Sequence, residues 1–282
     1  MTITNVHGLP ASFVEAVRRD PYQGGGDISA TALIDSPQRR ALLHKHKSNI
    51  DTDVSSMVWA LLGSAVHHIL ERSEVDGVVV EERLYAEVDG WEVSGQFDRY
   101  NPETRALQDY KVTTVYKLGG DKKDWTRQLN VLRWLCYQNG IEVDSLQICT
   151  ILRDWSHSRS LRDGSYPATN VVMVDIDMWT VEETEQYIKD RVALHRAARE
   201  GNAAPCTDEE RWYSGDKWAV KKPTAKRALR VFDNRKDAQD YKTDSTIVEH
   251  RPGEYRRCLH FCEAAPFCSQ WKTTKTTWGT DG

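Results

Sequence analysis

No apolar run in this 282-residue chain approaches the roughly 18 residues that a helix needs to cross a bilayer. Residues 1–10 also lack the basic start and the apolar stretch of a secretory signal peptide. A phosphate-binding loop of the Gly-x-x-x-x-Gly-Lys-Ser/Thr type is missing, so any nucleotide-driven unwinding would have to come from a partner. These absences predict a globular intracellular chain that does not enter a membrane.

An overall excess of positive charge is missing as well. The formal net charge is −4, with 38 Lys and Arg against 42 Asp and Glu, so a polyanion would be attracted only by local patches. Two basic patches are present, at 39–47 and at 211–257, and the second holds 13 Lys and Arg against 7 Asp and Glu. Each patch is equally typical of a solvated face.

Cysteine is too sparse for a disulfide framework, since there are six in the whole chain. Two lie in apolar stretches and are expected in the core, Cys136 and Cys149. The other four fall in the last third of the chain: Cys206, Cys258, Cys262 and Cys268. Four soft ligands are enough for a tetrahedral Zn²⁺ or a [4Fe–4S] cluster. Reduced structural cysteines are the alternative.

Tryptophan is frequent, with ten residues. Three fall among apolar positions and are expected in the core: Trp59, Trp134 and Trp179. Four lie near polar or basic sequence, where a nucleic-acid base could stack on them: Trp125, Trp155, Trp212 and Trp218. Packing at a seam between domains is the alternative for these four.

The hydrophobic pattern alternates between helical and strand periods. Helices are expected over 29–47 with an interruption at Pro37, over 54–72, over 125–138, and from a Thr180–Glu183 capping box to about Arg199. Strands are expected over 78–88 and 91–100, joined by an Asp89-Gly90 turn, and over 106–113, 146–153 and 171–176. This order predicts an α/β fold with a mixed central sheet flanked by helices. We expect a lead-in over 1–27, a core over 28–202, and a Cys-rich basic C-terminal module over 203–282 packed on that core.

Three charged residues lie on neighbouring predicted strands. Asp98 ends one strand, and Asp109 and Lys111 lie on the next, where side chains two residues apart share a face. Two buried carboxylates would be unfavourable with one lysine alone, whereas a hard divalent cation can compensate them. A surface ion pair on a half-exposed sheet is the alternative.

Polar residues on two flanking helices add to this group. His67 and Glu71 share a face of an otherwise apolar helix, and Gly63 is placed to let that helix approach another element closely. Gln128, early in the helix after the third strand, is positioned to face the same site.

The ordered set Gly63-x-x-x-His67, Gly95-x-Phe97-Asp98, Asp109-x-Lys111 and Gln128 resembles the motif series of RecB-like PD-(D/E)xK nucleases. The resemblance covers about residues 28–135, and it implies a restriction-endonuclease-like core. It also extends to the C-terminal cysteines, which are similar to those of iron–sulfur members such as the CRISPR-associated RecB-like exonucleases, and this favours [4Fe–4S] over Zn²⁺. The upstream cysteine of those members is replaced here by Ser36, which leaves Cys206 as the fourth ligand, with His260 as a weaker substitute.

The resemblance also implies roles for the site residues. His67, Asp98, Asp109 and the carbonyl of Tyr110 would bind Mg²⁺ or Mn²⁺, and Lys111 would be the catalytic lysine. Gln128 would match the glutamine of the Q-x-x-x-Y motif, whose tyrosine is replaced by Leu132.

The expected activity is metal-dependent hydrolysis of DNA phosphodiester bonds by an exonuclease in recombination, repair or phage DNA processing. It would take place in the cytoplasm of a bacterium or of a phage-infected host. A helicase or recombination protein and a second copy of the chain are candidate partners. Six basic residues are candidate DNA contacts: Lys217, Lys221, Lys222, Lys226, Arg227 and Arg230. The alternative function is a catalytically weak DNA-binding accessory protein with a metal-cluster scaffold.

Overall fold

The computed structural model describes residues 2–19, 24–73 and 75–278. The chain forms two compact units, one made of residues 1–37 and 47–203 and the other of 38–46 and 204–282. No helix among the described residues is long and apolar enough to span a membrane. The finer division into lead-in, core and module stays a prediction.

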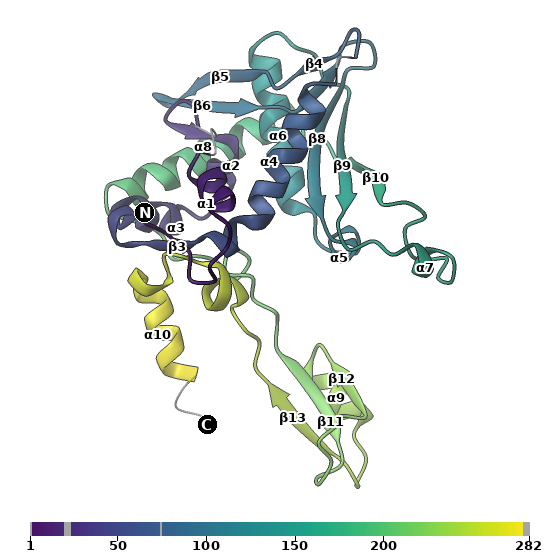
Figure 1. Ribbon diagram of the computed structural model, residues 1–282. Coiled ribbons are helices and arrows are strands. Elements are labelled where there is room, and N and C mark those ends of the chain that lie inside the picture. The colour runs from purple at the N-terminus through teal and green to yellow at the C-terminus, as the bar shows by residue number, and fades with distance from the viewer. Residues whose placement is uncertain (1, 20–23, 74, 279–282) are drawn as a thin grey trace. The chain divides into compact units, whose positions relative to one another are not determined.

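A five-stranded mixed sheet organises the first unit, with strand order β10-β9-β8-β7-β4 (Figure 1). Its strands are β4 (Val79–Val80), β7 (Arg99–Asn101), β8 (Ala106–Thr113), β9 (Ser145–Leu152) and β10 (Val171–Ile176). β8 and β9 are parallel, and the other neighbours are antiparallel. A smaller sheet has the order β2-β6-β5, with β2 (Ile28–Ser29), β5 (Arg83–Val88) and β6 (Trp91–Gln96).

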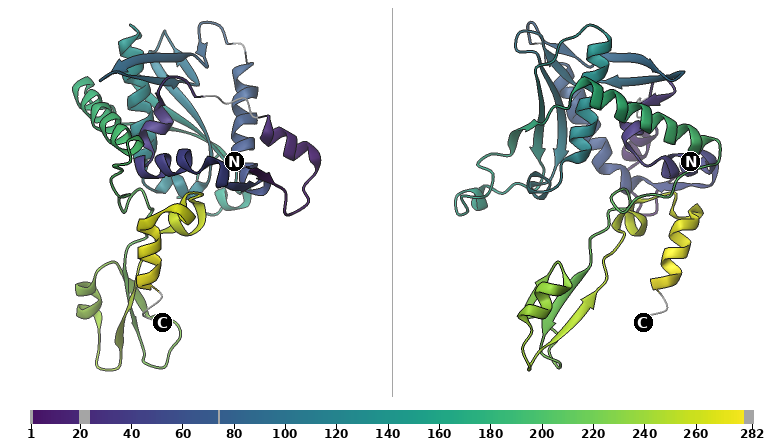
Figure 2. Two further views of the ribbon diagram at one scale, coloured as in Figure 1. Left: turned by 90° about the vertical axis from the view of Figure 1, so that its left-hand side faces the viewer. Right: turned by 180° about the vertical axis from the view of Figure 1, so that it is seen from behind.

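Helices cover both faces of the central sheet. α4 (Val58–Glu71) lies over one face, and α6 (Lys123–Gln138) lies over the other (Figure 1). α8 (Val181–Arg199) packs on the same side as α6, as the view from behind shows (Figure 2). The core between α6 and the sheets holds fully buried Leu107, Leu129, Leu135 and Ile148. The predicted fold class, a mixed sheet flanked by helices with cysteines in the C-terminal region, is therefore confirmed.

Local signals set several boundaries correctly. The Thr180–Glu183 capping box is formed at the start of α8, and the Ser29 hydroxyl caps α2 (Ala30–Ile34). Asp89 and Gly90 both have positive φ, at 50° and 74°, in the turn between β5 and β6. Such a turn matches the right-handed twist of a hairpin.

The strand predicted over 91–100 is wrong in one respect, because it is two strands. β6 ends at Gln96 and pairs with β5, whereas β7 begins at Arg99 and pairs with β8 in the other sheet. The chain changes sheets at Phe97 and Asp98, and Phe97 is fully buried there. This break places Asp98 at the edge of β8.

The remaining elements of the first unit are short. They are β1 (Thr2–Thr4), α1 (Ala11–Arg18), β3 (Asp51–Asp53), α5 (Val115–Gly119) and α7 (His157–Ser160), with 3₁₀ turns at Lys47–Asn49 and Val54–Met57. β1 pairs with β3 in parallel. The helix predicted from 54 therefore starts as a 3₁₀ turn before α4.

The second unit contains a three-stranded antiparallel sheet of order β12-β11-β13. Its strands are β11 (Lys217–Lys221), β12 (Arg230–Phe232) and β13 (Ile247–Arg251), and α9 (Arg235–Tyr241) packs against β11 and β12. α3 (Pro37–Lys45, from Gln38 onward), a π turn at Arg257–Phe261, a 3₁₀ turn at Ala265–Phe267 and α10 (Ser269–Trp278) complete the unit.

Candidate metal centre

Asp98 lies where β7 and β8 begin to pair. The first residue pair is Arg99 with Gln108, so Asp98 lies just beyond the paired region, opposite Asp109. Beyond this point no described strand pairs with β8 on the β7 side, so its backbone groups are open to side chains. Asp98 Oδ2 accepts a hydrogen bond from one of these groups, Tyr110 N, at 2.6 Å. Asp98 is only 7% exposed.

His67 on α4 contacts the other backbone polar group of Tyr110. Its Nε2 lies 3.1 Å from Tyr110 O, and its Nδ1 lies 3.3 Å from Asp98 Oδ1. The tyrosine ring meets the imidazole edge-on, with centroids 6.1 Å apart. His67, Asp98 and the Tyr110 backbone therefore lie close together, as predicted. The Tyr110 carbonyl, which was predicted to bind the metal, contacts His67 Nε2 instead.

Glu81 completes this group, and the sequence prediction missed it. Its Oε1 lies 3.7 Å from His67 Nδ1. One ligand atom from each of His67, Glu81 and Asp98 lies within 4.8 Å of the other two, a spacing that can hold a metal ion. The available signal was a pair of acidic residues, Glu81 and Glu82, that ends the apolar run of β4.

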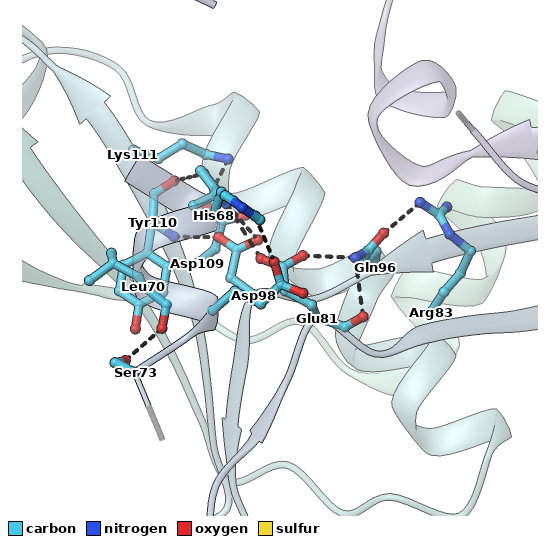
Figure 3. A network of polar contacts seen from close by, with 12 residues as sticks. His68, Leu70, Ser73, Glu81, Arg83, Gln96, Asp98, Asp109, Tyr110 and Lys111 are labelled. Carbon is cyan, nitrogen blue, oxygen red and sulfur yellow. Dashed lines mark hydrogen bonds and ion pairs between the residues drawn. The ribbon is translucent and has the colours of Figure 1, made fainter. Parts of the chain in front are cut away.

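The conformation of Glu81 is set by its neighbours. Its φ is +51°, in the left-handed region that non-glycine residues rarely occupy. Gln96 Nε2 donates to Glu81 Oε2 at 2.7 Å and to Glu81 O at 3.1 Å. Arg83 in turn donates to Gln96 Oε1 at 2.6 Å. Figure 3 shows Arg83 beside Gln96 and Gln96 beside Glu81, with Asp98 nearby. An unfavourable backbone conformation held by side-chain hydrogen bonds is typical of functional positions.

Asp109 and Lys111 form a second charged group on β8. Lys111 Nζ lies 2.6 Å from Asp109 Oδ2, and Gln128 Nε2 on α6 donates to Asp109 Oδ1 at 3.2 Å. Among the described residues, Oδ2 is buried and receives no well-aligned hydrogen bond. A buried acceptor without a hydrogen-bond donor is unfavourable, and a bound cation would compensate its charge.

Burial and charge act on this pair in opposite directions. Burial raises the pKa of Asp109, and the nearby Lys111 ammonium only partly offsets this. Burial also opposes the charged form of Lys111, but attraction to Asp109 outweighs it and raises the lysine pKa. Strong perturbation of adjacent groups of opposite charge is frequent at active sites.

The carboxylates near His67 favour the positively charged form of its imidazole. Hydrogen bonds to Asp98 and then to Glu81 raise the pKa of His67 to about 10. The three carboxylates Glu81, Asp98 and Asp109 therefore outnumber the cationic side chains His67 and Lys111. The donor set, one imidazole and several carboxylate oxygens, fits a divalent cation, whose binding would replace the proton on the imidazole.

Two predictions around α4 are wrong. Glu71 does not join the site, because its carboxylate lies 3.5 Å from His68 Nδ1 on the exposed face of the helix. Gly63 makes no close approach, since a Cβ built there would meet no described atom within 4 Å. It is Gly95 on β6 that packs tightly, as a Cβ there would lie 2.5 Å from Leu132 Cδ2.

The four C-terminal cysteines line one pocket within the second unit. Cys206, Cys258, Cys262 and Cys268 share it with residues of α3 and α10, including Leu42 and Trp271, whereas His260 does not line it. All four are free thiols. The pocket is thus a set of sulfur donors enclosed by four apolar side chains and by two arginines and two glutamines.

The basic residues predicted to contact DNA differ in their surroundings. Lys217 pairs with Asp233, and Lys221 pairs with Glu249. Arg230 lies over the ring of Phe232. The remaining three, in the segment between β11 and β12, are exposed: Lys222, Lys226 and Arg227.

No family model matches the chain, and no curated protein matches it. Among solved structures it is similar to the protein SSO0001, with a TM-score of 0.48 and 15% identity over 73% of this chain and 93% of that one. A protein from Eubacterium rectale whose name proposes an exonuclease gives a TM-score of 0.33 at 15% identity, over 51% of this chain and 56% of that one. A phage-related exonuclease from Haemophilus somnus 129PT gives 0.30 at 15% identity, over 67% and 76%. At TM-scores this low, the activity has to be inferred from the site itself.

Proposed function

We propose that this chain is a metal-dependent DNA nuclease that hydrolyses phosphodiester bonds. The observation that carries the proposal is the convergence of His67, Glu81 and Asp98 beside the buried Asp109–Lys111 pair. The first three supply metal ligands, and the last two, which lie two residues apart on β8, supply a further carboxylate and an ammonium.

Each side chain has a role that follows from its position. A bound divalent cation would lower the pKa of a coordinated water and stabilise charge on the scissile phosphate. Lys111 holds its ammonium next to Asp109, where it can orient the attacking water and stabilise the extra negative charge of the transition state. Gln128 holds Asp109 in place by donating a hydrogen bond from its Nε2 to Asp109 Oδ1.

The ligand set bears on the choice of metal. Mg²⁺ prefers oxygen ligands and retains several waters, whereas His67 adds an imidazole nitrogen. Nitrogen ligands are better tolerated by transition metals, so Mn²⁺ is the first metal to test and Mg²⁺ the second. The resemblance of the motif series to RecB-like nucleases makes exonuclease action, from DNA ends, the first mode to test.

The test compares end-labelled linear DNA with closed circular DNA in Mn²⁺, Mg²⁺ or EDTA, for the wild type and for Lys111→Ala. We expect metal-dependent loss of the linear DNA alone, and a rate at least about 100-fold lower in the variant, because a positioned catalytic group contributes on that order. Asp109→Ala should abolish cleavage while leaving DNA binding largely intact.

The outcomes separate the proposal from its alternative. Full activity in Lys111→Ala or Asp109→Ala would refute the site. No cleavage of either DNA by the wild type, with DNA binding intact, would instead favour the accessory protein with a metal-cluster scaffold. Leu132 is the feature that makes this alternative worth testing, because it is buried where the family motif has a tyrosine.

The cysteine pocket is proposed to hold a [4Fe–4S] cluster. Cys206, Cys258, Cys262 and Cys268 line this one pocket, and four thiolates suit either a tetrahedral Zn²⁺ or a [4Fe–4S] cluster. The resemblance of the C-terminal cysteines to those of iron–sulfur RecB-like nucleases favours the cluster. Its role would be structural because it closes a unit with a small core.

DNA is the proposed partner. Of the six basic residues, Lys222, Lys226 and Arg227 are the strongest candidates for phosphate contacts, because they are exposed and no carboxylate in the described part of the chain pairs with them as with Lys217 and Lys221. A helicase or recombination protein and a second copy of the chain stay predictions.

A further inference from the structure

Trp59 is exposed, contrary to the expectation that it lies in the core. It is the second residue of α4, and 58% of its surface is accessible to solvent. The guanidinium carbon of Arg153 lies 3.8 Å from the centroid of its ring. A cation at this distance covers one face of the indole and holds the ring in place. The ring is therefore a fixed and largely exposed aromatic surface.

Arg153 is tied to the strand that carries the catalytic pair. Its backbone N donates to the carbonyl of Thr113, the last residue of β8, at 3.0 Å. At the same end, Val115 N donates to Asp154 Oδ1 at 2.8 Å, which fixes the start of α5. Figure 1 shows α5 at the end of the β8–β9 pair. The aromatic surface is thus held at a defined position relative to Lys111.

A second aromatic residue lies at this end of the sheet. Tyr116 on α5 is 84% exposed. Exposed aromatic rings next to an exposed guanidinium are the surface features that bind single-stranded nucleic acid, since bases stack on the rings and the cation attracts phosphate.

We propose that Trp59, held by Arg153, stacks an unpaired base of single-stranded DNA and so positions the strand in the metal site. His67 lies eight residues after Trp59 on α4, which is about 12 Å along the helix. That distance is about three to four nucleotides of a stacked strand, at about 3.4 Å each. The spacing positions a strand for cleavage only if the proposed nuclease function holds, so this part of the inference rests on that function. Base stacking on Trp59 requires no cleavage.

The preference for single strands follows from the geometry of stacking. In a duplex both faces of an internal base are covered by neighbouring base pairs, so the indole has no free face to contact. An unpaired strand offers the face of every base, largely regardless of sequence. We therefore expect Trp59 to contribute to binding of single strands and little to binding of blunt duplex.

The test measures binding of fluorescein-labelled 12-nucleotide oligothymidine by anisotropy in EDTA, where cleavage is blocked. Trp59→Ala should weaken binding about 5- to 100-fold, the range expected for loss of one stacked base. Trp59→Phe should retain most of the affinity, and Trp59→Leu should not, because leucine keeps apolar area but has no aromatic face. Arg153→Lys should weaken binding because it keeps the charge and loses the planar contact.

Ile69→Ala is the matched control, since Ile69 is 61% exposed at the other end of α4. Equal loss of affinity in Ile69→Ala, or wild-type affinity in Trp59→Leu, would overturn the proposal. So would an equal effect of Trp59→Ala on a blunt duplex, or tighter Trp59-dependent binding of oligouridine, which would reassign the surface to RNA. Melting temperatures of the variants separate lost binding from lost folding.

The two proposals can fail separately. Cleavage by the wild type in Mn²⁺ tests the nuclease, and binding in EDTA tests the stacking surface. Trp59-dependent binding by a chain that cleaves nothing would reject the first proposal and retain the second.

Discussion

Glu81 illustrates how a single residue can complete a site without belonging to a recognisable motif. Its backbone has a positive φ, and Gln96 and Arg83 hold its carboxylate in line toward His67. Holding one carboxylate with two further side chains is typical of metal ligands, whose outer partners orient them. We infer that Glu81 is a metal ligand of equal standing with Asp98.

Glu81→Gln should weaken Mn²⁺ binding by about tenfold or more, because the amide retains the shape but not the charge of the carboxylate. Isothermal titration with Mn²⁺ measures the affinity directly and without DNA. Glu87→Gln, at an exposed position of the adjoining strand β5, is the control and should bind Mn²⁺ as the wild type does. Unchanged affinity in Glu81→Gln would remove Glu81 from the site.

At the scale of elements, two glycines of the motif series have opposite roles. Gly95 lets β6 lie against α6, because a Cβ there would meet Leu132 Cδ2 at 2.5 Å and Leu135 Cδ1 at 2.6 Å. Both leucines are buried in the core. Gly63 lies within α4 with no described atom near its missing Cβ.

Gly95→Ala should therefore lower the free energy of unfolding by about 1–3 kcal/mol, as overpacking of a filled core does. Gly63→Ala should raise it by about 0.5–1 kcal/mol, since alanine favours a helix interior over glycine. Chemical denaturation measures both. A stabilising Gly95→Ala would contradict the close packing of β6 on α6.

Asp53 joins the N-terminal segment to the 3₁₀ turn that precedes α4. Its carboxylate accepts hydrogen bonds from Ser55 Oγ and N, from Val6 N and from Thr4 Oγ1. These bonds, with that from the Ser55 hydroxyl the largest, lower the pKa of Asp53 well below its usual range. The carboxylate is thus stabilised in its charged form in the folded state.

A lowered folded-state pKa contributes stability that is present above the unfolded value, about 3.9 for aspartate, and that is lost as pH falls through the folded value. Asp53→Asn should therefore destabilise the protein at pH 7, and the difference from wild type should shrink as pH falls toward acid. Melting temperatures across this pH range test the prediction, with Asp51→Asn on the same strand as control. A difference that grows in acid would contradict it.

At the scale of the whole molecule, the two units carry different proposed metal sites. Carboxylates and an imidazole gather in the first unit, and four thiols line a pocket in the second. Hard and soft donor sets select different metals. We therefore expect each site to bind its metal independently, and the loss of one metal to leave the other bound.

Cys262→Ser should reduce the iron content and lower the melting temperature, because a cluster contributes its binding energy to folding. Mn²⁺ affinity at the first site should stay within about twofold of wild type, as expected for separate sites. Metal analysis, visible absorption and titration with Mn²⁺ provide the readouts. Normal iron content and melting in Cys262→Ser would count against the cluster, and zinc in place of iron would reassign it.

Much of the fold was accessible from the sequence because its signals are local. Periodicity, the Thr180–Glu183 capping box and the Asp89-Gly90 turn depend on residues within a few positions of one another. They therefore placed α6, α8, β8, β9 and β10 to within two residues or so. The same holds for Asp109 and Lys111, whose shared strand face follows from their spacing alone.

Other features depend on the path of the chain in space. The split of residues 91–100 into two strands follows from competition between two sheets, and it decides that Asp98 faces the free edge of β8. Glu81 joins His67 and Asp98 only because three separate segments converge, and Trp59 lies at the surface with Arg153 over its ring. The sequence by itself determined the elements and the chemical types of the site residues, since these follow from local preferences. Only the tertiary structure decided which side chains meet, because contacts between distant segments depend on how the whole chain packs.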